Sequence, residues 1–217
     1  MNQVLILLLI FSTSAFAQKS NRPYNCGFYD KDTAQLRKTY ETNIKYWEVK
    51  KGETIASIGA ANGNLEVRCS LFVDSINWTL EEIDSSCLNK TEFEKVLNYY
   101  QTLANKKVTS NFNLVIGSDT STNLTPNNYD RVLLINVYHE ITKQKEMIAE
   151  IYKILKNKGK LVIMERISNK KGKRRKDCPH IMTYEPDFIK LLNEQKFELV
   201  SRTEVHSLTY FIFKKTM

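Results

Sequence analysis

Apolar and polar residues follow each other along this chain in two rhythms, which predict helices and strands in turn. Apolar side chains spaced three to four residues apart predict helices, at residues 32–47, 65–71, 88–104, 145–155 and 186–194. Short apolar runs predict strands, at residues 54–58, 74–82, 113–117, 129–136, 160–167, 197–204 and 207–214. This alternation has the spacing of βαβ units, so we expect an α/β fold with a mostly parallel sheet.

Two local signals refine this arrangement. The last two strands are neighbours in sequence, which predicts an antiparallel pair at a sheet edge. Asn157-Lys-Gly159 is expected to end the preceding helix, with Gly159 at its C′ position. A chain of 217 residues, 42% of them hydrophobic, can bury one sizeable core. We therefore expect one domain over residues 18–217, with an N-terminal helical cap at about residues 30–50.

The N-terminus differs from the rest of the chain. Val4 to Phe11 is an apolar block, and the small residues after it end at Ala17 in the pattern that a signal peptidase cleaves. We interpret residues 1–17 as a signal peptide and expect a periplasmic or secreted mature protein. The block is shorter than the roughly 20 apolar residues that cross a bilayer, so no transmembrane segment is expected in the mature chain.

Four cysteines lie in the mature part of the chain: Cys26, Cys69, Cys87 and Cys178. An even number in an exported chain permits disulfides, with three connectivities among which the sequence does not choose. Four unpaired thiols are the alternative. None of the pairs has CxxC spacing, so we expect no metal site.

The net charge of +8 is concentrated in one segment. Lys170–Lys176 holds six cations in seven residues, which can attract phosphate groups or anionic lipid. A solvated loop is the plainer interpretation of such a run, and we favour it. The run contains no aromatic residues, and the chain has no nucleic-acid-binding motif, so a nucleic-acid partner is not predicted.

The first predicted strand ends in a turn of small residues. Gly59, Ala61 and Gly63 stand there at alternate positions. An α/β domain ends its first strand in this way where the backbone approaches a nucleoside ligand. The same pattern also closes hairpins and plain strand-to-helix joints, so its weight depends on the motifs further along the chain.

The motifs from Thr54 to Lys214 occur in the order of a known family. The third strand is followed by Gly117-Ser-Asp119, and the fourth strand contains Tyr129-Asp-Arg-Val-Leu-Leu134. After the fourth strand come Asn136 and His139, and the fifth strand is preceded by the segment Leu155-Lys-Asn-Lys-Gly-Lys-Leu161. Together with the glycine turn, this order resembles the class I S-adenosylmethionine-dependent methyltransferase family. The resemblance implies a Rossmann-like, mostly parallel seven-stranded sheet with helices on both faces and an antiparallel strand near the C-terminus.

The resemblance also implies a cofactor site. The acidic residue that holds the ribose of S-adenosylmethionine matches Glu82, with Asp84 as the alternative, and Asp119 would face the adenine amino group. The implied cofactor contacts are Gly59, Ala61, Gly63, Glu82, Ile83, Ser118, Asp119 and Asn136. Two positions depart from the family's pattern: Ser57 replaces the leading carboxylate, and Ala61 replaces the middle glycine, where a methyl group would crowd the cofactor if φ is positive.

The resemblance implies methyl transfer from S-adenosylmethionine to an unidentified small or medium acceptor. His139 is the candidate catalytic residue, as a general base or at the substrate mouth; capping the next helix is its alternative role. Two other functions stay open. One is a catalytically retired fold that binds anionic partners through Lys170–Lys176, and the other is an aminopropyl transferase similar to spermidine synthase.

Overall fold

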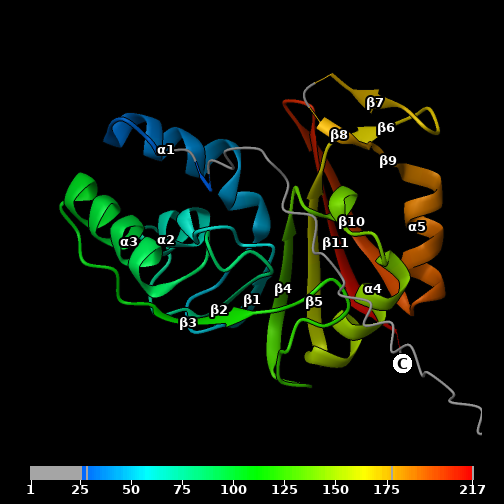
Figure 1. Ribbon diagram of the computed structural model, residues 1–217, viewed down its shortest axis with the longest axis horizontal. Coiled ribbons are helices and arrows are strands. Elements are labelled where there is room, and N and C mark those ends of the chain that lie inside the picture. The colour runs from blue at the N-terminus through cyan, green and yellow to red at the C-terminus, as the bar shows by residue number, and fades with distance from the viewer. Residues whose placement is uncertain (1–25, 28, 177, 217) are drawn as a thin grey trace, which may run out of the picture.

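The computed structural model describes residues 26–27, 29–176 and 178–216. The expected signal peptide, residues 1–17, lies outside the described residues. Within them the chain forms a seven-stranded sheet with helices on both faces (Figure 1).

The sheet has the strand order β10-β11-β5-β4-β1-β2-β3. Its parallel strands are β1 (Thr54–Ile58), β2 (Asn77–Glu82), β3 (Asn111–Ile116), β4 (Tyr129–Ile135) and β5 (Leu155–Glu165). β11 (Leu208–Lys215) runs antiparallel to β5 and to β10 (Phe197–Val205), which forms the edge. This confirms the expected mostly parallel seven-stranded sheet and its C-terminal antiparallel pair.

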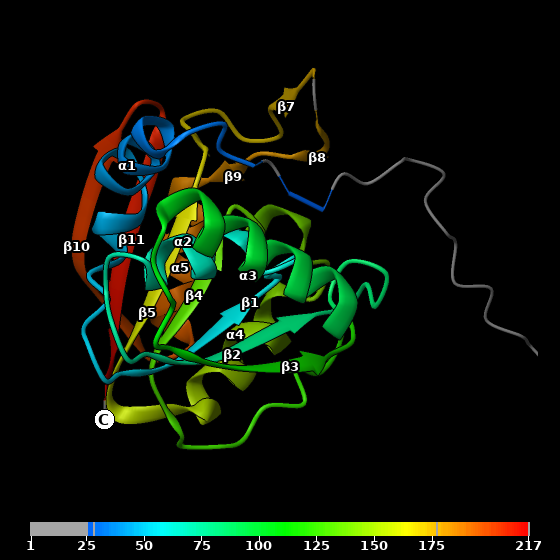
Figure 2. The ribbon, with the colours of Figure 1, turned by 90° about the vertical axis from the view of Figure 1, so that its left-hand side faces the viewer.

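The helices divide between the two faces of the sheet. Figures 1 and 2 show one face covered by α1 (Thr33–Thr42), α2 (Asn64–Ser70) and α3 (Lys90–Ala104), and the other by α4 (Gln144–Ile154) and α5 (Glu185–Glu194). The helix expected at residues 32–47 is interrupted at Asn43, whose φ of −136° is not helical. A 3₁₀ turn, η1 (Ile44–Trp47), continues from there.

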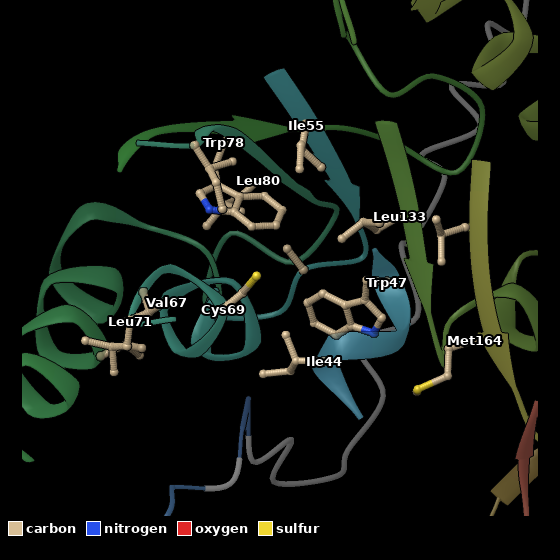
Figure 3. Packing of buried hydrophobic residues seen from close by; sticks show 14 of the residues in the cluster. Ile44, Trp47, Ile55, Val67, Cys69, Leu71, Trp78, Leu80, Leu133 and Met164 are labelled. Carbon is tan, nitrogen blue, oxygen red and sulfur yellow. The ribbon is translucent and has the colours of Figure 1, made fainter. Parts of the chain in front are cut away.

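Each face has its own hydrophobic core. On the α1–α3 side, Trp47 from η1 and Trp78 from β2 are fully buried among aliphatic residues of β1, α2 and β4 (Figure 3). On the other side, Ile148 and Ile151 of α4 pack with Phe188 of α5 against β4, β5 and β11. Because both faces are covered, β1 and β4 consist almost entirely of buried residues, as expected for central parallel strands.

A cluster of charges joins the amino ends of β1 and β4. Arg131 is 2% exposed and donates from Nε and Nη2 to the two carboxylate oxygens of Glu53, at 3.1 and 3.0 Å. Asp130 accepts from the Thr54 amide at 2.9 Å and from Lys156 at 2.8 Å. Asp130 therefore orders the base of the sheet, at the opposite end from the cavity formed where the parallel strands terminate.

The expected role of Gly159 was wrong. α4 ends at Ile154, and Leu155 is already extended because it pairs with Tyr129 at the start of β5. Gly159 lies inside β5, where an added Cβ would stand 2.9 Å from the Tyr129 carbonyl oxygen. Close approach of two strands, not a helix end, accounts for this glycine.

The segment between β5 and α5 contains short strands that the sequence pattern did not indicate. β6 (Ile167–Ser168) pairs with β9 (Thr183–Tyr184), and β7 (Arg174–Arg175) pairs with β8 (Cys178–Ile181). The basic run Lys170–Lys176 is therefore partly a hairpin strand rather than a plain loop. In Figure 1 this β7–β8 hairpin lies beyond one end of the sheet.

One disulfide joins Cys26 to Cys87, and the thiols of Cys69 and Cys178 are not in disulfides. Cys87 lies in the loop between β2 and α3. The bond therefore fastens the first described residues to the end of the sheet where the parallel strands terminate. With one bonded pair and two free thiols, the structure matches neither the three fully paired connectivities nor the four unpaired thiols that the sequence left open.

Candidate functional site

A cavity of about 600 Å³ opens where β1, β2 and β4 end. The strand order reverses between β1 and β4, and ligands of open α/β sheets bind at such a switch point. Ligand sites typically have volumes of about 300–1,000 Å³. The wall includes every residue implied as a cofactor contact except Gly63: Gly59, Ala61, Glu82, Ile83, Ser118, Asp119 and Asn136.

The turn after β1 has a left-handed backbone at alternate positions. The φ angles are +69° at Gly59, +50° at Ala61 and +76° at Gly63. A Cβ on Gly59 would meet the Val137 side chain at 2.5 Å, so this glycine is required both for its backbone angle and for space. Ala61 adopts the backbone that the middle glycine of such a turn supplies, with a conformational cost of roughly 1 kcal/mol.

Glu82 fixes this turn through its carboxylate. It accepts hydrogen bonds from the amide of Ala61 at 2.9 Å, and from those of Ile83 and Asp84 at 2.9 and 3.1 Å. A carboxylate offers about four acceptor sites, so roughly one remains for a ligand. The residue matched to the ribose carboxylate thus organises two loops of the site through their main chains.

Two further carboxyl groups lie buried in the cavity wall. Glu81 is 1% exposed, and burial raises its pKa to about 8 although the Gly59 amide points at one of its oxygens. Glu66, in the first turn of α2, is 2% exposed, and burial raises its pKa to about 7. Each has one oxygen with no hydrogen-bond partner among the described residues. Sequence reasoning missed both residues.

The loop after β3 contributes Ser118 and Asp119. The Ser118 hydroxyl accepts from the amide of Ser121 at 3.0 Å, so this side chain shapes its own turn. Asp119 is exposed at the cavity edge. After β4, Asn136 has a φ of +57°, and its amide donates to the Met164 carbonyl at 2.7 Å, which ties the β4 end to β5.

His139 lies behind the cavity wall, which is lined instead by its neighbour Glu140 and by His180. Its Nδ1 is 3.0 Å from both oxygens of Glu165, a carboxylate that is 1% exposed. The hydrogen bond to Glu165 raises the pKa of His139 to about 9. The His139 and His180 rings meet edge to face with their centres 6.1 Å apart.

The N-terminal segment closes one side of the cavity. Cys26 and Gly27 line it, and the disulfide to Cys87 holds them there. Asp30 forms a buried ion pair with Nε of Arg68 at 2.9 Å, and the Tyr100 hydroxyl lies 2.6 Å from the same nitrogen. No local pattern could indicate this role for the segment, because its partners stand 38 to 70 positions further along the chain.

Two classes of feature are absent from the described part of the chain. No group of three or more His, Cys, Asp or Glu side chains is arranged to hold a metal ion among residues 26–27, 29–176 and 178–216. Within those same residues, no helix is long and apolar enough to cross a membrane.

Comparison with known proteins places this geometry in context. Residues 88–163, from just before α3 to a point inside β5, match the family model described as a methyltransferase domain. No curated protein sequence matches the chain significantly.

Several solved structures share the fold. An S-adenosylmethionine-dependent methyltransferase from Aquifex aeolicus has a TM-score of 0.59 and 17% identity, over 85% of this chain and 98% of that one. One from Methanosarcina mazei has a TM-score of 0.61 and 14% identity, with coverages of 81% and 98%. The N,N-8-amino-8-demethyl-D-riboflavin dimethyltransferase of Streptomyces davawensis has a TM-score of 0.63 and 14% identity, with coverages of 84% and 54%.

The matched segment and the shared fold agree with the resemblance drawn from the motifs. The fold is that of the class I S-adenosylmethionine-dependent methyltransferase family, and residues 88–163 match a methyltransferase domain. S-adenosylmethionine is the cofactor of that family, and two features of this cavity fit it. The left-handed turn leaves the backbone open to close approach at Gly59, and the unpartnered oxygens of Glu66 and Glu81 suit a ligand that brings hydrogen-bond donors and positive charge.

Proposed function

We propose that this chain binds S-adenosylmethionine in the cavity and transfers its methyl group to a small or medium acceptor. The observation that carries this proposal is the turn Gly59–Gly63. It is left-handed at alternate positions, it is fixed by Glu82, and it opens onto a cavity walled by carboxyl groups.

The charge of the cavity supports a cationic ligand. The chain as a whole carries +8, yet the wall contains the carboxyl groups of Glu66, Glu81, Glu82, Asp119 and Glu140. Arg68 also lines it, but its guanidinium is paired with Asp30. A cation in the cavity favours the ionised forms of Glu66 and Glu81 and lowers their raised pKa values. A sulfonium with an ammonium group meets this requirement.

The family's contacts divide the cofactor among three loops. The free acceptor site of Glu82 suits a ribose hydroxyl. Ile83 is 60% exposed beside it and offers an apolar surface to the adenine. Asp119, at the edge of the cavity, suits the adenine amino group. The main chain at Gly59 is left for the amino-acid part.

The reacting end lies toward β4 and β5. The bound cofactor supplies an activated methyl group, so the protein must mainly aim the acceptor and take up its proton. Glu140 and His180 line the cavity and can accept a proton, at a carboxylate oxygen and a ring nitrogen. His139, held by Glu165, stands against His180 as its support. In this proposal Glu140 or His180 takes the proton-accepting role first expected for His139, and His139 supports His180.

Calorimetric titration tests the cofactor part of the proposal. We expect S-adenosylmethionine and S-adenosylhomocysteine to bind with micromolar dissociation constants, on the order of −8 kcal/mol. Glu82→Gln should weaken both, because a neutral amide cannot accept from the Ala61 amide and a ribose hydroxyl as the carboxylate does. Glu94→Gln, on the exposed face of α3, is the matched control and should bind as the wild type does.

Absence of heat and of any thermal shift at millimolar ligand would refute cofactor binding. It would leave both alternatives standing: the retired fold that binds through the basic run, and an aminopropyl transferase, which titration with the decarboxylated cofactor would detect. Binding without methyl transfer to any acceptor would retain the site and reject the activity.

We further propose that the acceptor carries negative charge and meets the basic run Lys170–Lys176. Support comes from the hairpin: β8, which pairs with β7 of that run, also carries His180 into the cavity wall. Lys173→Gln combined with Lys176→Gln should raise the KM for an anionic acceptor and leave the Kd for S-adenosylhomocysteine unchanged. An unchanged KM would reject this role.

Export stays a proposal, and the Cys26–Cys87 disulfide supports it because such bonds persist in oxidising compartments. N-terminal sequencing of protein recovered outside the cytosol should begin at Gln18. Protein that is found only in the cytosol and begins before Gln18 would contradict export.

A further inference from the structure

The carboxylate that the family places at the end of β1 is absent from this chain at position 57, and another carboxylate stands beside the gap. Ser57 is 1% exposed, and its hydroxyl donates to Oε1 of Glu66 at 2.6 Å. Glu66 comes from the helix that begins directly after the glycine turn. Both residues line the cavity, so a carboxyl group occupies the wall next to the position where the family has one.

The second carboxylate oxygen of Glu66 makes no hydrogen bond within the described part of the chain that would stabilise the fold. Oε2 is buried and has no hydrogen-bond partner among the described residues. The nearby guanidinium of Arg68 pairs with Asp30 at 2.9 Å instead. A buried acceptor without a partner is destabilising, and a ligand that donates a hydrogen bond to Oε2 would remove that cost. The terminal torsion of a glutamate is soft, so a small rotation brings an oxygen to the cavity surface.

We propose that Glu66 supplies from α2 the carboxylate that position 57 lacks, and that it accepts the α-ammonium group of the cofactor's amino-acid part. Ser57 is a positioning residue: its single hydroxyl proton holds Oε1 and leaves Oε2 for the ligand. This inference rests on the proposed function, because it assigns one contact within that cofactor site.

The contact between the two side chains also explains why a serine at position 57 occurs together with a glutamate at position 66. A glutamate at position 57 would put two buried carboxylates within contact of each other, and like charges at that distance oppose ionisation. A serine there removes the conflict and supplies a donor. The departure at position 57 is therefore one half of an exchange whose other half is Glu66.

Two ligands that differ in the amino-acid part test the assignment by calorimetry. S-adenosylhomocysteine carries the ammonium group, whereas 5′-methylthioadenosine lacks the whole amino-acid part. Glu66→Gln keeps the size of the side chain and loses its charge. We expect it to weaken S-adenosylhomocysteine roughly ten- to a hundredfold, as for loss of a charge-assisted hydrogen bond, and to change the affinity for 5′-methylthioadenosine by less than about twofold. Glu94→Gln should change neither affinity.

The outcomes separate the two proposals. If the wild-type protein binds neither ligand, the proposed function fails and the role of Glu66 fails with it. If the wild type binds both and Glu66→Gln weakens both equally, or weakens neither, only the role of Glu66 is overturned.

A second variant keeps the test decisive if Glu66→Gln does not fold. Ser57→Glu combined with Glu66→Ser moves the carboxylate back to β1 and keeps one carboxyl and one hydroxyl in contact. We expect this exchange variant to bind S-adenosylhomocysteine more tightly than 5′-methylthioadenosine, as the wild type does. An exchange variant that folds but has lost this preference would overturn the proposal.

Discussion

Removal of the Cys26–Cys87 disulfide should strongly destabilise the protein. The two cysteines are 61 positions apart, and their bond closes a loop that contains α1, β1, α2 and β2. For a loop of that length the chain-entropy model gives a stabilisation of about 4 kcal/mol. We expect a Cys26→Ala, Cys87→Ala double variant to lose about that much free energy of unfolding relative to the oxidised wild type.

Part of the N-terminal segment should stay in place in this variant. The Asp30–Arg68 ion pair and the hydrogen bond from the Tyr99 hydroxyl to the Asp30 carbonyl do not depend on the disulfide. Cys26 and Gly27, in contrast, have the bond as their covalent anchor at the cavity. The variant should therefore bind S-adenosylhomocysteine more weakly while α1 remains folded.

Urea denaturation monitored by circular dichroism measures the effect. Reduced wild-type protein should unfold at the same urea concentration as the double variant. Cys178→Ala removes a half-buried thiol that forms no disulfide, and it should change stability by much less than the double variant does. A double variant as stable as the oxidised wild type would refute the loop-closure argument.

Three other perturbations have defined directions. Ala61→Gly removes a Cβ from a left-handed position and should raise the free energy of unfolding by about 0.5–1 kcal/mol in urea titrations; a loss of stability would contradict this. Asp30→Ala leaves the Arg68 guanidinium buried without its carboxylate and should cost about 3 kcal/mol by the same measurement, whereas a cost below about 1 kcal/mol would show that other groups hold that charge. For Glu66 and Glu81 the pKa values are raised in the fold, to about 7 and 8, so the folded protein binds more protons than the unfolded chain does above pH 4.5. Stability of the ligand-free protein should therefore fall as pH rises from about 5 to 8, by at most about 1.4 kcal/mol per pH unit for each group, and Glu81→Gln should flatten the fall.

Much of the fold could be predicted from local pattern. Continuous apolar runs identified β1 and β4 because both faces of a central parallel strand are buried. Gly159 was misassigned because a glycine after a helix looks the same whether it ends that helix or admits a neighbouring strand, and only the Tyr129 carbonyl decides. The first helix ends at Asn43 although no proline or glycine there marks the end in the sequence.

Cavity residues that lie in a single loop next to a strand could be predicted from the sequence. Contacts between residues of different elements could not. The turn at Gly59–Gly63 and the carboxylate of Glu82 lie next to their strands, so order along the chain was enough to find them. The contact between Ser57 and Glu66 depends on the angle at which α2 leaves the turn. Its only sequence signal is a glutamate in the first turn of the next helix, and that residue gains meaning only when it is considered together with the missing carboxylate at position 57.

The positions of the cavity-lining residues along the chain have an evolutionary consequence. The residues proposed to hold the cofactor come from the loops after β1, β2 and β3, whereas Met164 and His180, which also line the cavity, come from β5 and the β7–β8 hairpin. The hairpin strands pair with each other and lie outside the seven-stranded sheet. Insertions or substitutions in the hairpin can therefore accumulate without disturbing the sheet or the turn at Gly59. Under the proposed function, selection can change the acceptor through the hairpin while the residues that would hold the methyl donor are inherited unchanged.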